Sequence, residues 1–207
     1  AVAQWDLKRM LAYSSVAQIG YIVLGIGLAN PSGLAGGLLH LVGHSFMKGC
    51  LFLAAGSILY RTNVRDIRQL RYLSVRMPWT ATFFAVSAFS FIGIPPTLGF
   101  FSKFYLILGA IEAQQWAFVA IILLTSILAL MYFVNVLRYM YFFPENDGEG
   151  PVTARPRRPE PNDVPLPMLL PMGLLAVGSV ALGLFNGEIV TRFLDPAVAA
   201  SIARLGP

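Results

Sequence analysis

One stretch sets the architecture of the chain: Gly93-Ile94-Pro95-Pro96-Thr97-Leu98-Gly99-Phe100-Phe101-Ser102-Lys103. It lies inside an apolar run that extends from residue 78 to residue 111. Two adjacent prolines cannot continue a helix, because each lacks a backbone N–H and its ring clashes with the preceding turn. The glycines at 93 and 99 add backbone freedom on both sides. We therefore expect one helix that is interrupted in its middle, with a lysine directly after the break.

The composition is typical of a membrane protein. The 207 residues are 57% hydrophobic and 12% charged, whereas a soluble domain carries roughly 25% charged residues. Several apolar runs approach the length of about 20 residues that an α-helix needs to cross a bilayer. The sequence therefore predicts an all-α polytopic membrane protein with about five transmembrane helices, one of them discontinuous around Gly93–Lys103.

The other spans are separated by polar segments. We expect them at residues 10–29, 34–60, 116–142 and 166–185, with Asp6 as the N-cap of the first and a turn at 30–33. Residues 66–73 are expected to form a short interfacial helix. Residues 144–165 are rich in Pro, Glu, Arg and Gly, which predicts a disordered polar loop. The chain then divides into 1–143, the loop at 144–165, and a final helix with an amphipathic tail at 166–207.

The basic residues indicate the orientation in the membrane. If residues 78–111 make one crossing, nearly all the arginines and lysines outside the spans share one side of the membrane, and only Arg192 and Arg204 face the other. Cytoplasmic loops carry the excess of Lys and Arg, so the N-terminus is expected to be cytoplasmic. Two separate crossings would move the arginines at 155–158 to the opposite side. The charge asymmetry therefore favours one interrupted helix.

Two of the three lysines, Lys48 and Lys103, lie within predicted spans. Each costs about 2.5–3.5 kcal/mol at the centre of a membrane helix on insertion scales, and such residues usually mark ion pathways. Snorkelling is the structural alternative for Lys48, and a polar helix start is the alternative for Lys103. All ten carboxylates fall in loops or at span ends. Either the lysines are often neutral, or acidic partners come from a neighbouring chain.

Lys48 belongs to a stripe with His40 and His44, spaced four residues apart on one helix face. Because histidine exchanges protons near neutral pH, the stripe predicts a proton relay; hydrogen bonding between helices is the structural alternative. A zinc site is disfavoured because His-x3-His lacks a third ligand: Cys50, the only cysteine, lies off the stripe. No phosphate loop, dinucleotide fingerprint, iron–sulfur or haem motif occurs, so we expect no cofactor, metal or catalytic residue.

Three motifs together resemble a known family: Asp6-Leu-Lys-Arg-Met-Leu-Ala-Tyr-Ser-Ser-Val-Ala-Gln-Ile-Gly-Tyr21, His40-x3-His44-x3-Lys48, and Gly93 to Lys103. They are similar to the proton-translocating antiporter-like membrane subunits of NADH–quinone oxidoreductase, Mrp-type cation/proton antiporters and membrane-bound hydrogenases. The likeness covers about residues 4–143. Residues 64–67 and 103–113 look most like the D-type antiporter and hydrogenase branch.

The resemblance implies two inverted five-helix repeats, of which this chain supplies most of the second plus the final helix. It implies that Lys103 is the broken-helix lysine of an exit-side half-channel fed by His40, His44 and Lys48. Asp6 and Lys8 match a motif whose role is either at the pathway entrance or structural. The backbone of the break is carried by Gly93, Pro95, Pro96 and Gly99.

The first repeat, with its glutamate–lysine pair, is not in this sequence, so we expect a fragment or a split gene product that works with other membrane subunits. The predicted function is proton translocation, with or without coupled sodium, inside a multisubunit antiporter or redox-driven pump of a prokaryotic plasma membrane. The alternative is a structural scaffold of a hydrogenase or quinone-reductase complex that conducts nothing itself. Neither function requires enzyme chemistry in this chain.

Overall fold

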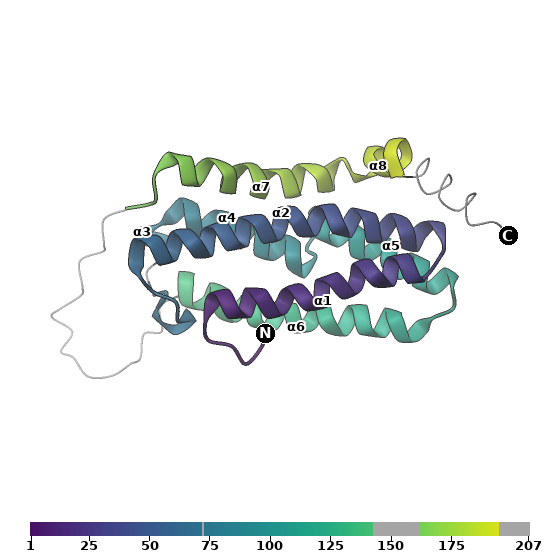
Figure 1. The fold of residues 1–207 in the computed structure, drawn as a ribbon, viewed down its shortest axis with the longest axis horizontal. Helices are drawn as coiled ribbons and strands as arrows, with labels where there is room; N and C mark the ends of the chain where they lie inside the picture. The colour runs from purple at the N-terminus through teal and green to yellow at the C-terminus, as the bar shows by residue number, and fades with distance from the viewer. Residues whose placement is uncertain (72, 143–161, 195–207) are drawn as a thin grey trace.

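The chain folds into a bundle of long helices that lie roughly along one direction (Figure 1). The computed structural model describes residues 1–71, 73–142 and 162–194, and no strand occurs among them. The elements are α1 (Leu7–Gly27), α2 (Pro31–Thr62), the 3-10 turn η1 (Ile67–Gln69), α3 (Leu73–Arg76), α4 (Pro78–Ile92), α5 (Leu98–Glu112), α6 (Trp116–Tyr141), α7 (Leu166–Leu184), α8 (Asn186–Ile189) and the π-helical η2 (Val190–Leu194).

The helices have the lengths that a bilayer requires. Within the described residues, α1, α2, α6 and α7 are long and apolar enough to cross a membrane. The helices α4 and α5 have 15 residues each, and together they make the fifth crossing. The prediction of an all-α polytopic membrane protein with one discontinuous span is confirmed.

The two halves of the broken span follow one another along α2 (Figure 1). A Cβ atom added at Gly36 of α2 would lie 2.7 Å from the Leu106 nitrogen of α5. Further along α2, the Cys50 thiol donates to the Phe83 carbonyl of α4 at 3.5 Å. The 32-residue α2 therefore packs against both α5 and α4, which run antiparallel to it as a single interrupted crossing.

The α1–α2 connection is shorter than predicted, because α2 already begins at Pro31. The Asn30 side chain accepts from the Gly33 N–H at 2.8 Å and donates to the Gly109 carbonyl of α5 at 2.7 Å. An Asn N-cap followed by proline in the first turn is a strong helix start, since proline supplies no N–H where none is needed. The expected turn at 30–33 is thus the first turn of α2.

The prediction of an interfacial helix at 66–73 is wrong. Among the described residues of that range, the structure has a 3-10 turn at Ile67–Gln69, and the four-residue α3 begins only at Leu73. The Ile67 N–H donates to the Trp5 carbonyl at 2.8 Å, and the Leu7 N–H donates to the Arg65 carbonyl at 3.0 Å. These bonds tie residues 65 and 67 to the start of α1, and the turn that follows is 3-10 rather than α-helical.

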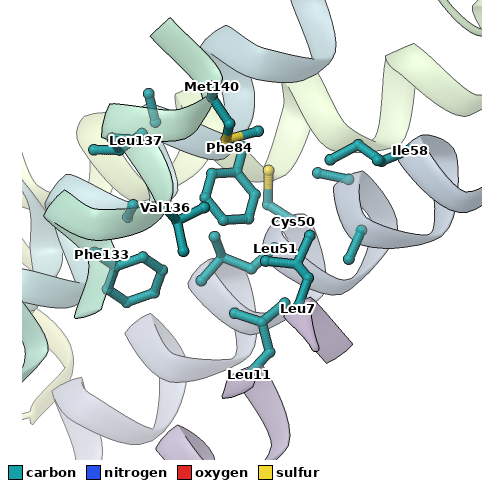
Figure 2. Packing of buried hydrophobic residues seen from close by; sticks show 14 of the residues in the cluster. Leu7, Leu11, Cys50, Leu51, Ile58, Phe84, Phe133, Val136, Leu137 and Met140 are labelled. Atoms are coloured by element: carbon teal, nitrogen blue, oxygen red, sulfur yellow. The ribbon is translucent and has the colours of Figure 1, made fainter. Parts of the chain in front are cut away.

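The hydrophobic core gathers α1, α2, α4 and α6 near the end of the bundle where this loop lies. Phe84 and Phe91 of α4 both meet the ring of Phe133 on α6 edge-on, at 6.2 and 5.1 Å between centroids. Leu11 of α1 and Leu51 of α2 are fully buried in the same cluster. Figure 2 shows this packing, with Cys50 at its centre. The core therefore fixes α4, the first half of the broken span.

Two expectations fall partly outside the described residues. The predicted loop at 144–165 is described only from residue 162, where Asp163 bonds to the start of α4. The predicted tail is described to residue 194, as α8 and η2. The arginines at 155–158 and Arg204 also lie outside the described part, and the division into 1–143, 144–165 and 166–207 stays a prediction.

Candidate functional site

The break in the membrane span leaves two carbonyl groups without helical partners. In an α-helix, the N–H of residues 95 and 96 would bond to the carbonyls of Phe91 and Ile92. Both positions are proline and have no N–H to offer. The helix α4 instead ends at Gly93, which has a left-handed φ of 96° and donates to Phe89 and Ser90. The carbonyls of Phe91 and Ile92 are therefore free for another donor.

Lys103 supplies that donor from the other side of the break. Its Nζ donates to the carbonyl oxygens of Phe91 and Ile92, both at 2.9 Å, and only 5% of the residue is exposed. The C-terminus of a helix carries the negative end of its dipole, so the end of α4 is a favourable place for an ammonium group. The Tyr21 ring of α1 lies 5.6 Å from the same Nζ.

His40 is fully buried in the middle of α2. Its Nδ1 lies 2.8 Å from the Ser102 hydroxyl on α5, and its Nε2 lies 2.9 Å from the Gln18 side-chain oxygen on α1. Tyr21 meets the imidazole edge-on at 5.2 Å. Because Ser102 directly precedes Lys103, the histidine is hydrogen-bonded to the turn of helix that carries the lysine.

Lys48 turns from α2 toward α1. Its Nζ donates to the Leu11 carbonyl at 2.5 Å and to the Ser14 hydroxyl at 2.6 Å. The ring of Phe91 lies 4.8 Å from this Nζ, which is a cation–π distance. Since Phe91 also gives its carbonyl to Lys103, one residue of α4 contacts both buried lysines.

The predicted stripe lies on one face of α2 but is not a direct hydrogen-bonded chain in the described residues. The rings of His40 and His44 stack at 6.4 Å between centroids. The Nε2 of His44 is buried without a hydrogen-bond partner, and Lys48 bonds to α1 rather than to His44. A relay along the stripe would therefore need water between its members.

Both lysines are bound only by neutral oxygens. Within residues 1–71, 73–142 and 162–194, no Asp or Glu pairs with Lys48 or Lys103. In the same part of the chain, no three His, Cys, Asp or Glu side chains gather to hold a metal ion. The arrangement suits groups that gain and lose protons, and it does not supply a counter-ion of its own.

Two small cavities reach this network beside α6. One, of about 180 Å³, is lined by Lys103, Gly93 and Ser126 among apolar side chains. The other, of about 170 Å³, is lined by Ser14 and Gln18, the partners of Lys48 and His40. Each has room for water molecules. One cavity thus adjoins Lys103, and the other adjoins hydrogen-bond partners of the stripe.

Asp6 and Lys8 lie at the outer end of α1. The Asp6 carboxylate accepts from the Arg9 N–H at 2.9 Å, so the predicted N-cap is confirmed. Residue 6 also pairs with Asp66 in an isolated bridge, and Lys8 is exposed. These contacts give Asp6 a structural task and leave the role of Lys8 in any pathway untested.

Four further residues contact the buried lysines and His40 and were not predicted as site residues. They are Ser14, Gln18 and Tyr21 on α1, and Ser102 on α5. A usable signal was present: Ser14, Gln18 and Tyr21 are spaced by four and three residues, which places them on one face of a helix. Polar side chains inside a membrane span usually face the protein interior.

Comparison with known proteins places this chain in a family. Residues 1–129 match the family described as NADH:quinone oxidoreductase/Mrp antiporter, transmembrane. The chain belongs to this family. It is 44% identical over 205 residues to NADH-quinone oxidoreductase subunit N of Desulforudis audaxviator, covering 96% of this chain and 40% of that protein. It is 30% identical over 205 residues to the D-type subunit of the Na(+)/H(+) antiporter of Alkalihalophilus pseudofirmus, with the same coverages.

A solved structure agrees with this assignment. A chain in the Mrp complex from Dietzia superposes with a TM-score of 0.84 at 29% identity, over 97% of this chain and 43% of that one. The family resemblance inferred from the motifs is therefore confirmed, while the two identities, 44% and 30%, do not single out the D-type branch. The chain spans about two fifths of the length of these relatives. It is an integral membrane protein of this antiporter-like family.

Proposed function

We propose that this chain forms part of a proton pathway across the membrane in a multisubunit complex. The observation that supports it most is the environment of Lys48 and Lys103, two buried lysines whose hydrogen bonds, in the part of the chain that the structure describes, go to carbonyl and hydroxyl oxygens. Because neither lysine is paired with a carboxylate in the described residues, neither proton is held by an ion pair there. Lys103 loads and releases the proton, and His40, His44 and Lys48 connect it to the rest of the pathway.

Acidic partners for these lysines come from outside the chain. The relatives are about two and a half times as long as the aligned region, since this chain covers 40% of them. The missing part, as a further segment or a separate subunit, supplies the first repeat and its carboxylates. Other membrane subunits are therefore the proposed partners, as the multisubunit Mrp and complex I structures that match this fold suggest.

The orientation follows from the distribution of charge in the fold. Basic residues gather at the bundle end that holds the start of α1 and the end of α2. They are Lys8, Arg9, Arg61, the arginines among residues 63–77, and Arg138. The opposite end carries the Asn30 cap and Glu112. Because cytoplasmic segments carry the excess of Lys and Arg, we propose that the basic end and the N-terminus face the cytoplasm of a prokaryote.

The test replaces Lys103 with alanine in the complete complex. The complex is purified and reconstituted into liposomes, a potassium diffusion potential is imposed, and proton uptake is followed with an internal pH dye, with and without sodium. Lys103→Ala should abolish uptake while the complex still assembles. Arg192→Ala is the control, because in the described residues the ion pair of this exposed side chain is with exposed Glu188.

The outcomes separate the candidate functions. Uptake at the wild-type rate in the Lys103→Ala complex would refute the pathway. A scaffold role predicts instead that variants of His40 and His44 impair assembly and leave uptake unchanged in whatever complex forms. A sodium-dependent rate would show exchange, the activity named for the antiporter relative.

A further inference from the structure

Side chains from two other helices hold the His40 imidazole. Gln18 of α1 lies 2.9 Å from Nε2 and Ser102 of α5 lies 2.8 Å from Nδ1. All three residues are at most 1% exposed. Tyr21 against the ring edge and His44 against its face complete the enclosure. The ring therefore cannot turn over easily, and each nitrogen keeps the same neighbour.

A count of donors and acceptors assigns the protons. A neutral imidazole has one N–H donor and one acceptor nitrogen. The Gln18 oxygen faces Nε2 and can only accept, so Nε2 carries the hydrogen. Nδ1 is then the acceptor and receives the Ser102 O–H. In this arrangement, both ring nitrogens of His40, the Gln18 oxygen and the Ser102 hydroxyl each take part in a hydrogen bond.

A second arrangement satisfies the same atoms. Rotation of the Gln18 amide by half a turn presents its NH₂ group to Nε2, which then accepts. The hydrogen now belongs on Nδ1 and is donated to the Ser102 oxygen. The Ser102 O–H still has an acceptor, the Gly99 carbonyl at 3.1 Å. The site is thus built for two hydrogen-bonding states that differ in the nitrogen that carries the proton.

We propose that Gln18 and Ser102 form a switch that sets the tautomer of His40, with Gln18 as the positioning residue that rotates as each proton passes. The proposal rests on the proton pathway proposed above. A proton accepted at the nitrogen that lacks a hydrogen makes the ring an imidazolium, and the other nitrogen then releases its proton on its own side. The ring ends neutral in the other tautomer, and the Gln18 amide turns to match it. The tautomer therefore decides from which side His40 can next accept a proton.

The switch makes different predictions for two replacements of Gln18. Gln18→Glu leaves only acceptor oxygens, so it should hold the proton on Nε2. Gln18→Met keeps the length of the side chain without hydrogen bonds, so it should leave the tautomer unset. Each should slow proton uptake by about tenfold to a hundredfold, as the loss of a hydrogen-bond partner that orients a metal-binding histidine does. Gln69, an exposed glutamine outside the helices that hold the site, provides matched controls as Gln69→Glu and Gln69→Met.

The tautomer of His40 can be measured directly, and a purely structural role of Gln18 would leave it unchanged. The complete complex is labelled with ¹⁵N-histidine, and the His40 ring signals are assigned by their loss in His40→Gln. Gln18→Glu should place the proton on Nε2 and Gln18→Met should give mixed signals, while the Gln69 variants match the wild type. Because a buried glutamate can prevent assembly, Ser102→Ala is measured in parallel, and its loss of the Nδ1 partner should also shift the signals.

The outcomes separate this proposal from the pathway it depends on. Wild-type uptake in His40→Gln would refute passage of protons through His40. Slow uptake in His40→Gln with wild-type uptake and unchanged ring signals in Gln18→Met and Ser102→Ala would overturn the switch alone.

Discussion

Lys103 donates to the main-chain carbonyl oxygen of Phe91 at 2.9 Å, across the gap between α5 and α4. The ring of the same Phe91 lies 4.8 Å from the Nζ of Lys48. One residue therefore contacts both buried lysines, one through its backbone and the other through its side chain. A change of side chain at this position should affect Lys48 and leave the backbone bond of Lys103 in place.

Phe91→Leu tests this division. The variant loses the cation–π contact, worth about 0.5–2 kcal/mol, and the edge-on contact with Phe133 at 5.1 Å. We expect a lower melting temperature of the purified complex. Phe118→Leu, at a partly exposed ring of α6, should change it little. Equal melting temperatures for the two variants would show that the Phe91 ring contributes nothing special.

Gly93→Ala tests the backbone of the break. Gly93 has a φ of 96°, and its new Cβ would lie 3.3 Å from Cδ and 3.5 Å from Nζ of Lys103. A left-handed conformation costs a non-glycine residue about 1–2 kcal/mol, and the methyl group crowds the lysine. Both the thermal stability of the complex and its proton uptake should fall.

Gly20→Ala is the matched control for the break. Its Cβ would meet no atom within 4 Å, in the interior of α1. Alanine is favoured over glycine inside a helix by about 0.5–1 kcal/mol, so stability should hold or rise. If both alanine variants behaved alike, the special geometry of Gly93 would be irrelevant to stability.

Asp163→Ala tests how α4 is anchored. The Asp163 carboxylate accepts from the backbone N–H groups of Trp79 and Thr80, at 2.8 and 3.2 Å, and so acts as a helix cap from 84 residues away. Loss of a cap costs about 0.5–2 kcal/mol. We expect a lower melting temperature, measured against Glu188→Ala, which removes only an exposed ion pair. A larger loss in Glu188→Ala would contradict the capping role.

Asp66 gives a pH dependence in the loop outside the membrane. Hydrogen bonds and charge from Arg68 lower the pKa of the Asp66 carboxyl below its ordinary value. A lowered folded pKa stabilises the protein at neutral pH, and this contribution is lost as the pH falls through that pKa. The stability difference between wild type and Asp66→Asn should therefore persist down to the ordinary carboxyl range and shrink below it. Thermal unfolding across acid pH measures it, and a difference that grows on acidification would have the wrong sign.

Most helices could be predicted from the sequence because apolar runs, helix caps and helix-breaking residues are local signals. The Asp6 cap and the discontinuous span around Gly93 followed from residue types alone. The expected helix at 66–73 is a 3-10 turn instead, and the backbone at Arg65 and Ile67 bonds to Leu7 and Trp5, about 60 positions away. The stripe lay on one face as predicted, but its hydrogen bonds go to α1 and α5.

The missing hydrogen bonds at the break follow from residue types alone. Prolines at 95 and 96 leave the carbonyls of Phe91 and Ile92 without helical donors in any fold that keeps α4. The donor that replaces them, and the partners of the stripe, follow from how the helices pack. The partners of His40 are 22 and 62 residues away, and Lys48 bonds to a carbonyl 37 residues away. Such contacts depend on how whole helices pack, because no spacing within one helix specifies which neighbour will face it.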